Sequence, residues 1–275
     1  MDIAPGLHVD GVSRTQAARL ALLWQLDKLF PPDPHALLDA AGQTQRSMNL
    51  ADRGAGRYLA ELGSRDVDVL DFGCGWGGET LWLAQRVGSV VGVDIEAKAI
   101  EQANRASAAS PMRNCRFVHA ASELLPFPDQ AFDAVFSTNV FEHVMDLDIV
   151  FSELFRVLRP GGVLLSRFGP LFFSPHGYHL YWACQVPYAH LLCGLDAVLA
   201  LRNARCDTPR TATSWQSLGL NGRRYCDFKR SASSAGFSLE RFDRIPVRQL
   251  RWLASIRGIG DLVTFGIDCH LRRPR

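Results

Sequence analysis

The sequence predicts an α/β fold: a doubly wound, mostly parallel seven-stranded sheet with helices on both faces. From residue 67 onward, short apolar runs rich in β-branched residues alternate with helical stretches, which indicates crossover connections between parallel strands. A glycine-rich turn follows the first of these runs and leads into a helix, as in sheets that bind a ligand at their carboxyl edge. The chain has 275 residues, 47% of them hydrophobic, which is enough for one large core.

Each predicted element has its own hydrophobic pattern. Residues 14–30 carry apolar side chains at helical spacing and end at three prolines, residues 35–50 are less regular, and residues 52–62 are again helical. The stretch 170–221 breaks the alternation, yet it is too apolar for a plain linker, so we expect one or two helices within it. The predicted strands are residues 67–72, 90–95, 117–121, 132–138, 163–168, 237–245 and 262–271, and the helices between them are 78–86, 97–109, 147–158 and 223–235.

The formal net charge is only +2, but it is unevenly distributed along the chain. Residues 1–201 hold 15 basic and 22 acidic residues, a balance of −7, whereas residues 202–275 hold 15 and 6, a balance of +9. A basic segment can face an anionic substrate, a nucleic acid or a membrane surface. The basic residues are scattered singly with few aromatic residues between them, so we expect no nucleic-acid partner. Peripheral membrane contact and a homodimer stay open.

The cysteines and the start of the chain favour a cytoplasmic protein. The seven cysteines form no Cys-x-x-Cys pair, which argues against a disulfide framework or a zinc knuckle and fits a reducing compartment. Asp2 and Asp10 lie where a secretory leader would be positively charged. No apolar stretch is long enough to cross a bilayer, so we expect no transmembrane segment.

The strongest chemical signal is the run 69–78, which reads VLDFGCGWGG. Gly73 and Gly75 permit backbone angles and a close approach of a ligand that a side chain would block. The helix that follows presents free N–H groups to a carboxylate or a phosphate. Asp94 lies 21 residues after Gly73 at the end of the second strand, where an acid accepts hydrogen bonds from ribose hydroxyls. We therefore expect a nucleotide-like cofactor at this turn.

Two classes of cofactor fit the glycine turn. Gly73, Gly75 and Gly78 also satisfy the Gly-x-Gly-x-x-Gly pattern of dinucleotide sites, so the turn alone does not separate hydride transfer from methyl transfer. Asp71 stands just before the turn. An anion there suits a ligand with an ammonium or sulfonium group and is awkward beside a pyrophosphate. Asp71 therefore favours S-adenosyl-L-methionine as the cofactor.

Three further motifs follow the glycine turn in order. Residues 125–133 read LPFPDQAFD, residues 140–144 read VFEHV, and residues 156–162 read RVLRPGG. Together with the glycine turn and the Ala-Gly-Phe turn at 235–237, this set resembles the ubiquinone/menaquinone-biosynthesis-type (methyltransferase type 11) branch of class I S-adenosylmethionine-dependent methyltransferases. The resemblance implies a Rossmann-like fold and methyl transfer from S-adenosyl-L-methionine to a small molecule, with oxygen as the expected acceptor atom.

The resemblance also implies roles for matching positions. Asp71, Gly73, Cys74 and Gly75 would line the methionine and ribose part of the cofactor, and Asp94 would hold the ribose hydroxyls. The remaining implied contacts are Ile95 on the adenine face, Ser122 and Glu123 at the adenine edge, and Asn139 near the transferring methyl group.

One matching position departs from the family pattern. Ala121 stands where an acidic residue commonly accepts a hydrogen bond from the adenine amino group. The methyl side chain of Ala121 cannot accept one, so Ser122, Glu123 or a backbone group must substitute. In related folds an insertion after the fifth strand covers the acceptor. The pattern of elements predicts one domain, with an N-terminal helical cap over residues 1–64, a core over 65–275 and an insertion at about 170–221. The resemblance implies that the core is the methyltransferase core and the insertion a substrate lid.

Histidines are the expected catalytic groups. Methyl transfer is an in-line displacement in which the protein mainly holds the acceptor close and dry, and a base is needed only when the acceptor loses a proton. His143 follows the fourth strand at the carboxyl edge of the sheet, and His176, His179 and His190 lie in the predicted lid. We expect no metal, because His-x-x-His with one distant histidine and no carboxylates is a weak ligand set.

Three other functions fit parts of the sequence. Transfer to carbon or nitrogen of a small molecule or lipid is the nearest alternative. A module that binds the cofactor without catalysis, or a nicotinamide dehydrogenase, would share the glycine turn. A nucleic-acid amino-methyltransferase is disfavoured, because residues 139–142 read NVFE where such enzymes carry Asn/Asp-Pro-Pro-Tyr. Aromatic residues at 168–192 suit an acceptor pocket, an ordinary core or a surface that rests on a membrane.

Overall fold

The computed structural model describes residues 2–4, 7–8, 13–30, 48–49, 56–62, 66–180, 183–205 and 211–275. The chain forms two compact units. The core unit consists of Leu38–Phe168, Cys226–Asp243 and Ile267–Arg275, and the second unit consists of Met1–Leu37, Gly169–Tyr225 and Arg244–Gly266. The predicted division, with a cap over 1–64 and a core over 65–275, stays a prediction.

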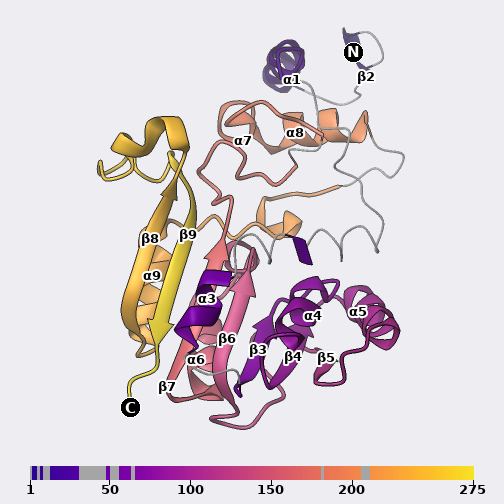
Figure 1. Cartoon of the computed structure of the whole chain (residues 1–275). Coiled ribbons are helices and arrows are strands. Elements are labelled where there is room, and N and C mark those ends of the chain that lie inside the picture. Colours follow the sequence, from indigo (N-terminus) through magenta and orange to yellow (C-terminus); the bar gives the residue numbers. More distant parts are fainter. Residues whose placement is uncertain are drawn as a thin grey trace. The chain divides into compact units, whose positions relative to one another are not determined.

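A seven-stranded sheet is the centre of the core unit. Its strands are β3 Asp68–Phe72, β4 Ser89–Asp94, β5 Cys115–His119, β6 Phe132–Thr138, β7 Leu158–Phe168, β8 Ser238–Pro246 and β9 Thr264–Arg272. They lie in the order β5-β4-β3-β6-β7-β9-β8 (Figure 1). The pairs from β5 to β7 are parallel, and β9 runs antiparallel to β7. The predicted mostly parallel, Rossmann-like sheet is confirmed.

Helices cover both faces of this sheet. The helices of the core unit are α3 Gly56–Glu61, α4 Gly78–Ala84, α5 Ala97–Ala109, α6 Leu147–Val157 and α9 Tyr225–Ser234, with the short 3-10 helix η2 Phe141–His143. Figure 1 shows α3 in front of the sheet and α6 and α9 behind it. Alternate residues of β7 serve the two layers: Val163 and Leu165 pack with Tyr58 of α3, whereas the Phe168 ring lies 5.0 Å from the ring of Phe228 on α9.

Two details of the strands differ from the sequence prediction. β7 begins at Leu158 rather than at residue 163, because Leu158 already pairs with Phe132 before the register shifts to Ala134 and Val163. The Arg-Pro-Gly-Gly run at 159–162 is therefore an irregular part of the strand itself. A separate pair of short strands, β1 Asp2–Ala4 and β2 Leu7–His8, was not predicted.

The second unit has a hydrophobic core of its own, formed largely by helices. Its helices are α1 Arg14–Asp27, α7 Ala189–Leu192 and α8 Gly194–Asn203, with 3-10 helices η3 Gln216–Leu218 and η4 Arg248–Leu253. Ser13 and Gln16 form a capping box that fixes the start of α1. Leu20 and Leu23 of α1 are buried in one cluster with Val198 of α8. The two helices in the stretch 170–221 match the expectation.

The first helix ends earlier than predicted. The pattern 14–30 predicted a helix up to the prolines, whereas α1 ends at Asp27. Pro31, Pro32 and Pro34, and most of the less regular stretch 35–50, lie outside the described residues. Among the helices that the structure describes, none combines the length and the apolar character needed to cross a bilayer.

Candidate cofactor site

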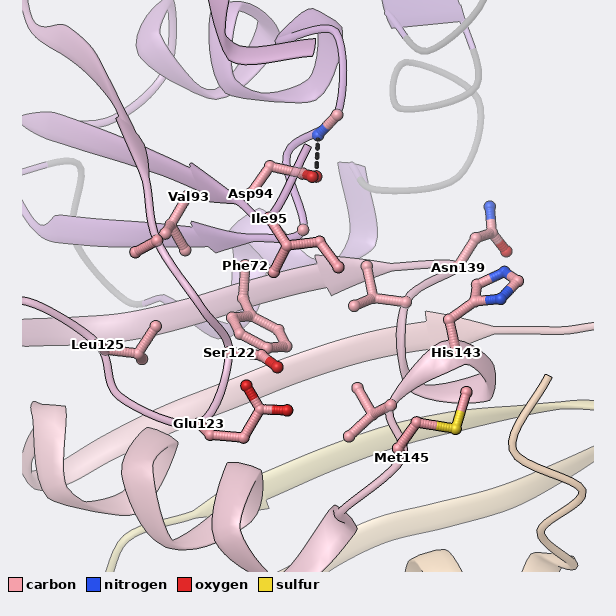
Figure 2. Close-up of a pocket in the computed structure, with 15 residues that line it drawn as sticks. Phe72, Val93, Asp94, Ile95, Ser122, Glu123, Leu125, Asn139, His143 and Met145 are labelled. Carbon is pink, nitrogen blue, oxygen red and sulfur yellow. Dashed lines mark hydrogen bonds between the residues drawn. The ribbon is translucent and has the colours of Figure 1, made fainter. Parts of the chain in front are cut away.

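A cavity of about 410 Å³ opens in the core unit where β3, β4 and β6 end. This volume lies within the ~300–1,000 Å³ range of small-molecule and cofactor pockets. Figure 2 shows Asn139 and His143 at one end of the cavity and Ser122 and Glu123 at the other. The cavity is lined by Phe72, Gly73, Gly75, Val93, Asp94, Ile95, Ala120, Ser122, Glu123, Leu125, Asn139, Val140, His143, Val144 and Met145.

The two glycines of the turn meet different surroundings. Gly73 has φ +76°, and a Cβ atom there would lie 2.2 Å from Cγ2 of Val140. Gly75 has φ +50°, and a Cβ atom there would have no neighbour within 4 Å. Gly73 is therefore required for the packing of the turn, whereas Gly75 leaves its backbone open toward the cavity.

Asp94 is held by the backbone on both of its carboxylate oxygens. The Gly75 N–H donates to Oδ2 at 2.8 Å, the bond drawn in Figure 2, and the Glu96 N–H donates to Oδ1 at 2.9 Å. Each oxygen of a carboxylate has a second lone pair, so Asp94 can still accept hydrogen bonds from a ligand. A fixed, part-exposed carboxylate on the cavity wall is suited to a pair of ribose hydroxyls.

Two of the sequence motifs together hold the opposite wall. The Arg156 guanidinium donates to the carbonyls of Leu125 and Phe127 at 3.1 and 2.8 Å. It also bonds Glu153 Oε2 at 2.8 Å, and that carboxylate in turn accepts the Leu125 N–H at 3.0 Å. The bond to Arg156 holds the pKa of Glu153 below its usual value. The motifs at 125–133 and 156–162 thus fix the loop that carries Ser122 into the cavity.

Two carboxyl groups are buried beside the glycine turn. Asp71 is 1% exposed, and the Thr80 hydroxyl donates to its Oδ2 at 2.6 Å. Burial raises the pKa of Asp71 to about 7, and the nearby charge of Asp94 adds to this effect. Burial likewise raises the pKa of Glu79 to about 8, with a contribution from the charge of Asp71, although the Thr138 hydroxyl bonds Glu79. Near neutral pH these acids are therefore partly protonated.

The predicted cofactor residues divide into two groups. Asp71 and Cys74 are buried and are not among the cavity-lining residues, so a role for them would act through the turn that they support. Burial also raises the pKa of the Cys74 thiol, so it stays protonated. The predicted residues that do line the cavity are Gly73, Gly75, Asp94, Ile95, Ser122, Glu123 and Asn139.

Several residues at this site were not predicted from the sequence. Phe72, Val93 and Met145 line the cavity, and each of them neighbours a predicted residue or motif at the end of a strand. Their position beside predicted strand ends or motifs could therefore have indicated that they line the cavity. Glu79 was also missed, although an acid in the first turn of α4, directly after the glycine run, could have been noted.

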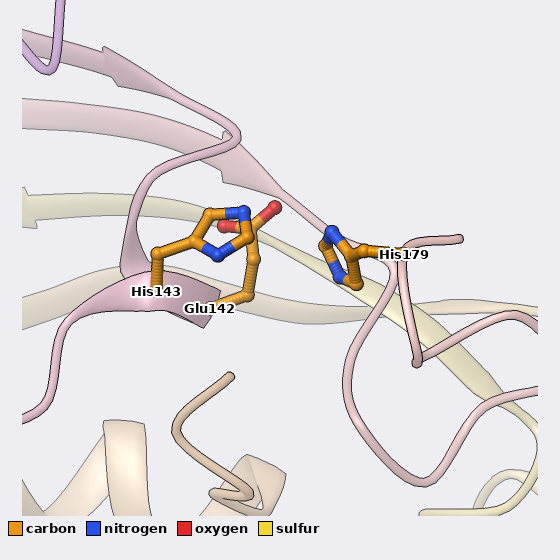
Figure 3. A group of neighbouring side chains, drawn as sticks. All are labelled: Glu142, His143 and His179. Atoms are coloured by element: carbon orange, nitrogen blue, oxygen red, sulfur yellow. The ribbon is translucent and has the colours of Figure 1, made fainter. Parts of the chain in front are cut away.

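His143 is the predicted catalytic histidine that lines the cavity. It is exposed at the end of η2, which follows β6 after Asn139, a residue with φ +53°. Figure 3 shows the His143 imidazole beside the Glu142 carboxylate, and a ring nitrogen and a carboxylate oxygen of this pair lie within 4.8 Å. The pair offers a proton acceptor on the cavity wall with a carboxylate close behind it.

The other candidate histidines belong to the second unit. His190 is 3% exposed, and its ring N–H donates to the Phe172 carbonyl. Burial lowers the pKa of His190 to about 4, so it is a neutral core residue near pH 7. The His179 ring donates to the Pro170 carbonyl at 2.7 Å, and burial lowers the pKa of His176. Their predicted contact with an acceptor stays a prediction.

Comparison with known proteins identifies the family. Residues 70–166 match the protein family described as Methyltransferase domain. Demethylmenaquinone methyltransferase of Symbiobacterium thermophilum is 36% identical over 138 residues, which cover 47% of this chain and 55% of that protein. The tRNA 5-carboxymethoxyuridine methyltransferase of Escherichia coli is 30% identical over 179 residues, which cover 61% of this chain and 67% of that protein.

The chain belongs to the class I S-adenosylmethionine-dependent methyltransferases. The resemblance to the ubiquinone/menaquinone-type branch of these enzymes is thereby confirmed. A third relative, 27-O-demethylrifamycin SV methyltransferase of Amycolatopsis mediterranei, is 35% identical over 128 residues, 46% of each chain. The chain spans little more than half the length of the Symbiobacterium protein.

Solved structures show the same fold. A putative sarcosine dimethylglycine methyltransferase from Galdieria sulphuraria superposes with a TM-score of 0.56 at 16% identity, covering 94% of this chain and 98% of that one. The cyclase SpnF superposes with a TM-score of 0.53 at 17% identity, covering 94% of each chain. Since one of these proteins is named a cyclase, the shared fold does not by itself specify methyl transfer.

Proposed function

We propose that this chain transfers a methyl group from S-adenosyl-L-methionine to a small-molecule acceptor, at an oxygen atom. The observation that carries the proposal is the arrangement of Gly75 and Asp94 on one cavity wall. Gly75 leaves its backbone open, and its N–H holds a carboxylate that still has lone pairs free for ribose hydroxyls. Bound there, S-adenosyl-L-methionine would supply an electrophilic methyl group.

The residues present fit this cofactor better than a dinucleotide. Asp94 would hold the ribose, Ile95 would cover one adenine face, and Ser122 and Glu123 would meet the adenine edge. No described arginine or lysine lines the cavity. The carboxylate on the cavity wall, Asp94, favours a cationic ligand over a pyrophosphate.

Calorimetric titration tests the cofactor directly. S-adenosyl-L-methionine should bind and nicotinamide dinucleotides should not. Asp94→Ala should weaken binding by about 1–3 kcal/mol, because ribose hydroxyls would lose a fixed acceptor. Glu96→Ala serves as the matched control, since Glu96 contributes only its N–H to Asp94. Equal affinity of the wild type and Asp94→Ala for the cofactor would remove Asp94 from the site.

Label transfer tests the reaction and its acceptor class. Labelled methyl from S-adenosyl-L-methionine, added with a fractionated extract of the source organism, should appear in an extractable small-molecule fraction. Acid and base stability of the labelled product would separate oxygen from carbon or nitrogen acceptors. Label in RNA would instead favour the alternative suggested by the tRNA-modifying relative. Cofactor binding without label in any fraction would favour a non-catalytic module.

His143 is the proposed general base for an oxygen acceptor. It lines the same cavity as Asn139, where the methyl group is expected, and it has a carboxylate within 4.8 Å. His143→Gln should lower kcat about 10²-fold or more while S-adenosyl-L-methionine affinity stays unchanged. Unchanged kcat across the pH range would show that the acceptor needs no base, as expected for transfer to a neutral carbon or amine.

The histidines of the predicted lid are proposed to contact the acceptor. Single changes His176→Ala and His179→Ala should leave cofactor affinity unchanged, because the cofactor cavity is built from core-unit residues. If either change lowers turnover at saturating cofactor, the second unit contributes to the acceptor site. If neither does, the lid proposal is wrong.

A further inference from the structure

Figure 1 shows the connection between β8 and β9, residues 247–263 of the second unit. This connection carries an unusual set of exposed apolar side chains. Trp252 is 68% exposed, although tryptophan is among the residues that gain most from burial. The other large apolar side chains exposed on or next to this connection are Ile256 at 42%, Ile259 at 41%, Leu262 at 37% and Phe265 at 40%. A run of this kind marks an interaction surface rather than the scatter normal for single residues.

The base of this connection is held in place by hydrogen bonds. The Val247 N–H donates to the Val263 carbonyl at 2.7 Å, which closes the stem. The Thr264 hydroxyl donates to the Gly260 carbonyl at 2.6 Å, and Arg244 donates to the Thr264 hydroxyl at 2.7 Å. Ala254 and Val263 are buried beneath. Small residues thus fill the base while the large apolar side chains point outward, so their exposure is a fixed property of the segment.

The exposed charges on this segment are all positive. Arg248, Arg251 and Arg257 are exposed, and none of them forms an ion pair with an acid of the described part of the chain. The one acid between residues 247 and 265 is Asp261, which lies 3.4 Å from Arg224 and 3.1 Å from Arg244. The charge of Asp261 is therefore balanced by Arg224 and Arg244. The three exposed arginines have no acidic partner in the described part of the chain.

A hydrogen bond joins this connection to α7. The Tyr188 hydroxyl, at the start of α7, donates to the Leu262 carbonyl at 3.0 Å. Leu191 and Leu192 of this helix are 40% and 62% exposed. Exposed apolar side chains are thus present on both segments that this bond joins.

We infer that this surface, Arg248–Phe265 with Leu191 and Leu192, docks the protein on a bilayer that contains anionic lipids. Apolar side chains with tryptophan enter the boundary between headgroups and acyl chains, and arginines contact lipid phosphates. RNA would leave Ile256, Ile259 and Phe265 in water. A second copy placed on the same face would bring its three unpaired arginines against these three. A bilayer with negatively charged headgroups above an apolar interior matches both the arginines and the apolar side chains.

Vesicle co-sedimentation of the full chain tests this inference without any methylation step. The protein should bind phosphatidylcholine vesicles that contain about one third phosphatidylglycerol, and binding should fall with added salt. Binding to pure phosphatidylcholine vesicles should be weaker by about tenfold or more. Failure of the proposed methyl transfer would leave these results unaffected.

Two pairs of variants separate this surface from general charge and general apolarity. Arg251→Glu with Arg257→Glu should weaken vesicle binding about tenfold or more, whereas Arg14→Glu with Lys229→Glu, an equal change of net charge at exposed sites elsewhere, should not. Trp252→Ala should also weaken binding, whereas Leu124→Ala, at a side chain 74% exposed in the core unit, should not.

Four outcomes would overturn the inference. Absence of binding to anionic vesicles is the first, and equal loss in the control variants is the second. The third is a dimer in sedimentation velocity that Trp252→Ala dissolves, without vesicle binding, which would make the face a contact between two copies. Binding of a model RNA that depends on Arg251 and Arg257 in place of vesicle binding would have the same consequence.

Discussion

The core unit and the second unit use polar groups in opposite ways. In the core unit, polar side chains gather at the carboxyl ends of parallel strands, where Asp94 and Asn139 border a cavity. In the second unit, the polar group of His190 is enclosed by aromatic rings, with Phe172, Tyr178 and Trp215 centred 5.0, 5.2 and 5.8 Å away. The first arrangement leaves polar groups available to a ligand, and the second encloses one within a core.

This difference shows that residue type alone is a poor guide to functional residues. A histidine in an irregular, aromatic-rich stretch invites a catalytic interpretation, yet His190 is a buried neutral residue bonded to a carbonyl. A glycine and an aspartate at strand ends invite a structural interpretation, yet Gly75 and Asp94 border the cavity. Position relative to the sheet is therefore more informative than residue type.

The largest expected effect lies at the glycine turn. Gly73→Ala should lower the free energy of unfolding by about 2–5 kcal/mol, because φ +76° strains an L residue and its Cβ would overlap Val140. Binding of S-adenosyl-L-methionine should be lost with it. Thermal unfolding and calorimetry measure the two effects.

Gly75→Ala is the matched control for the glycine turn. Its φ of +50° carries a similar backbone strain, but its Cβ would meet open space. We expect a loss of only about 1–2 kcal/mol in stability, with weaker cofactor binding because the new methyl group narrows the cavity. Equal destabilisation by the two changes would show that packing against Val140 is unimportant.

The core unit was largely predictable because its pattern is local. The strand 132–138 and the helix 97–109 were predicted with the bounds that the structure shows, since each is an unbroken periodic run. The start of β7 was missed because its first residue pairs across an irregularity, which no local pattern signals. Asp71, predicted to line the cofactor, is buried beside the glycine turn, and its role there stays a prediction.

The second prediction concerns the aromatic enclosure in the second unit. His190→Ala should lower the free energy of unfolding by about 2–4 kcal/mol, because it leaves a cavity among three rings and an unbonded Phe172 carbonyl. His176→Ala, at a half-buried residue of the same cluster, should have less than half of that effect. Denaturant unfolding checks both, and an equal loss in the two variants would contradict the enclosure as the cause.

The second unit resisted prediction because its order comes from contacts between distant segments. Tyr178 donates to the carbonyls of Cys184 and Val186, and Arg205 pairs with Asp27 of α1 across most of the chain. Such contacts have no periodicity, so the sequence indicated one or two helices in an apolar stretch but not the contacts that hold them. The same limit applies to the exposed patch at 247–263, which appears in sequence as ordinary apolar residues between two strands.

The smallest expected effect compares the two units by pH. The folded-state pKa of His190 is lowered from 6.5 to about 4, so its contribution to stability is present above pH 6.5 and is lost as pH falls toward 4. The folded-state pKa of Asp71 is raised from 3.8 to about 7, so its contribution is present below pH 3.8 and is lost as pH rises through 7. Between about pH 4 and pH 6.5 the two contributions change in opposite directions and offset each other, so a variant is needed to separate them.

Asp71→Asn should remove the loss of stability that Asp71 causes as pH rises. The amide cannot ionise, and its oxygen can still accept from Thr80, so the variant's advantage over the wild type should begin near pH 4 and grow by about 1–2 kcal/mol between pH 6 and pH 8. Glu79 and Asp94, the other acids that act on this group or respond to it, remain in place. Unfolding of both proteins in urea from pH 4 to pH 8 measures the difference. A difference between the two proteins that stays constant from pH 6 to pH 8 would assign the loss at high pH to Glu79 instead and contradict its assignment to Asp71.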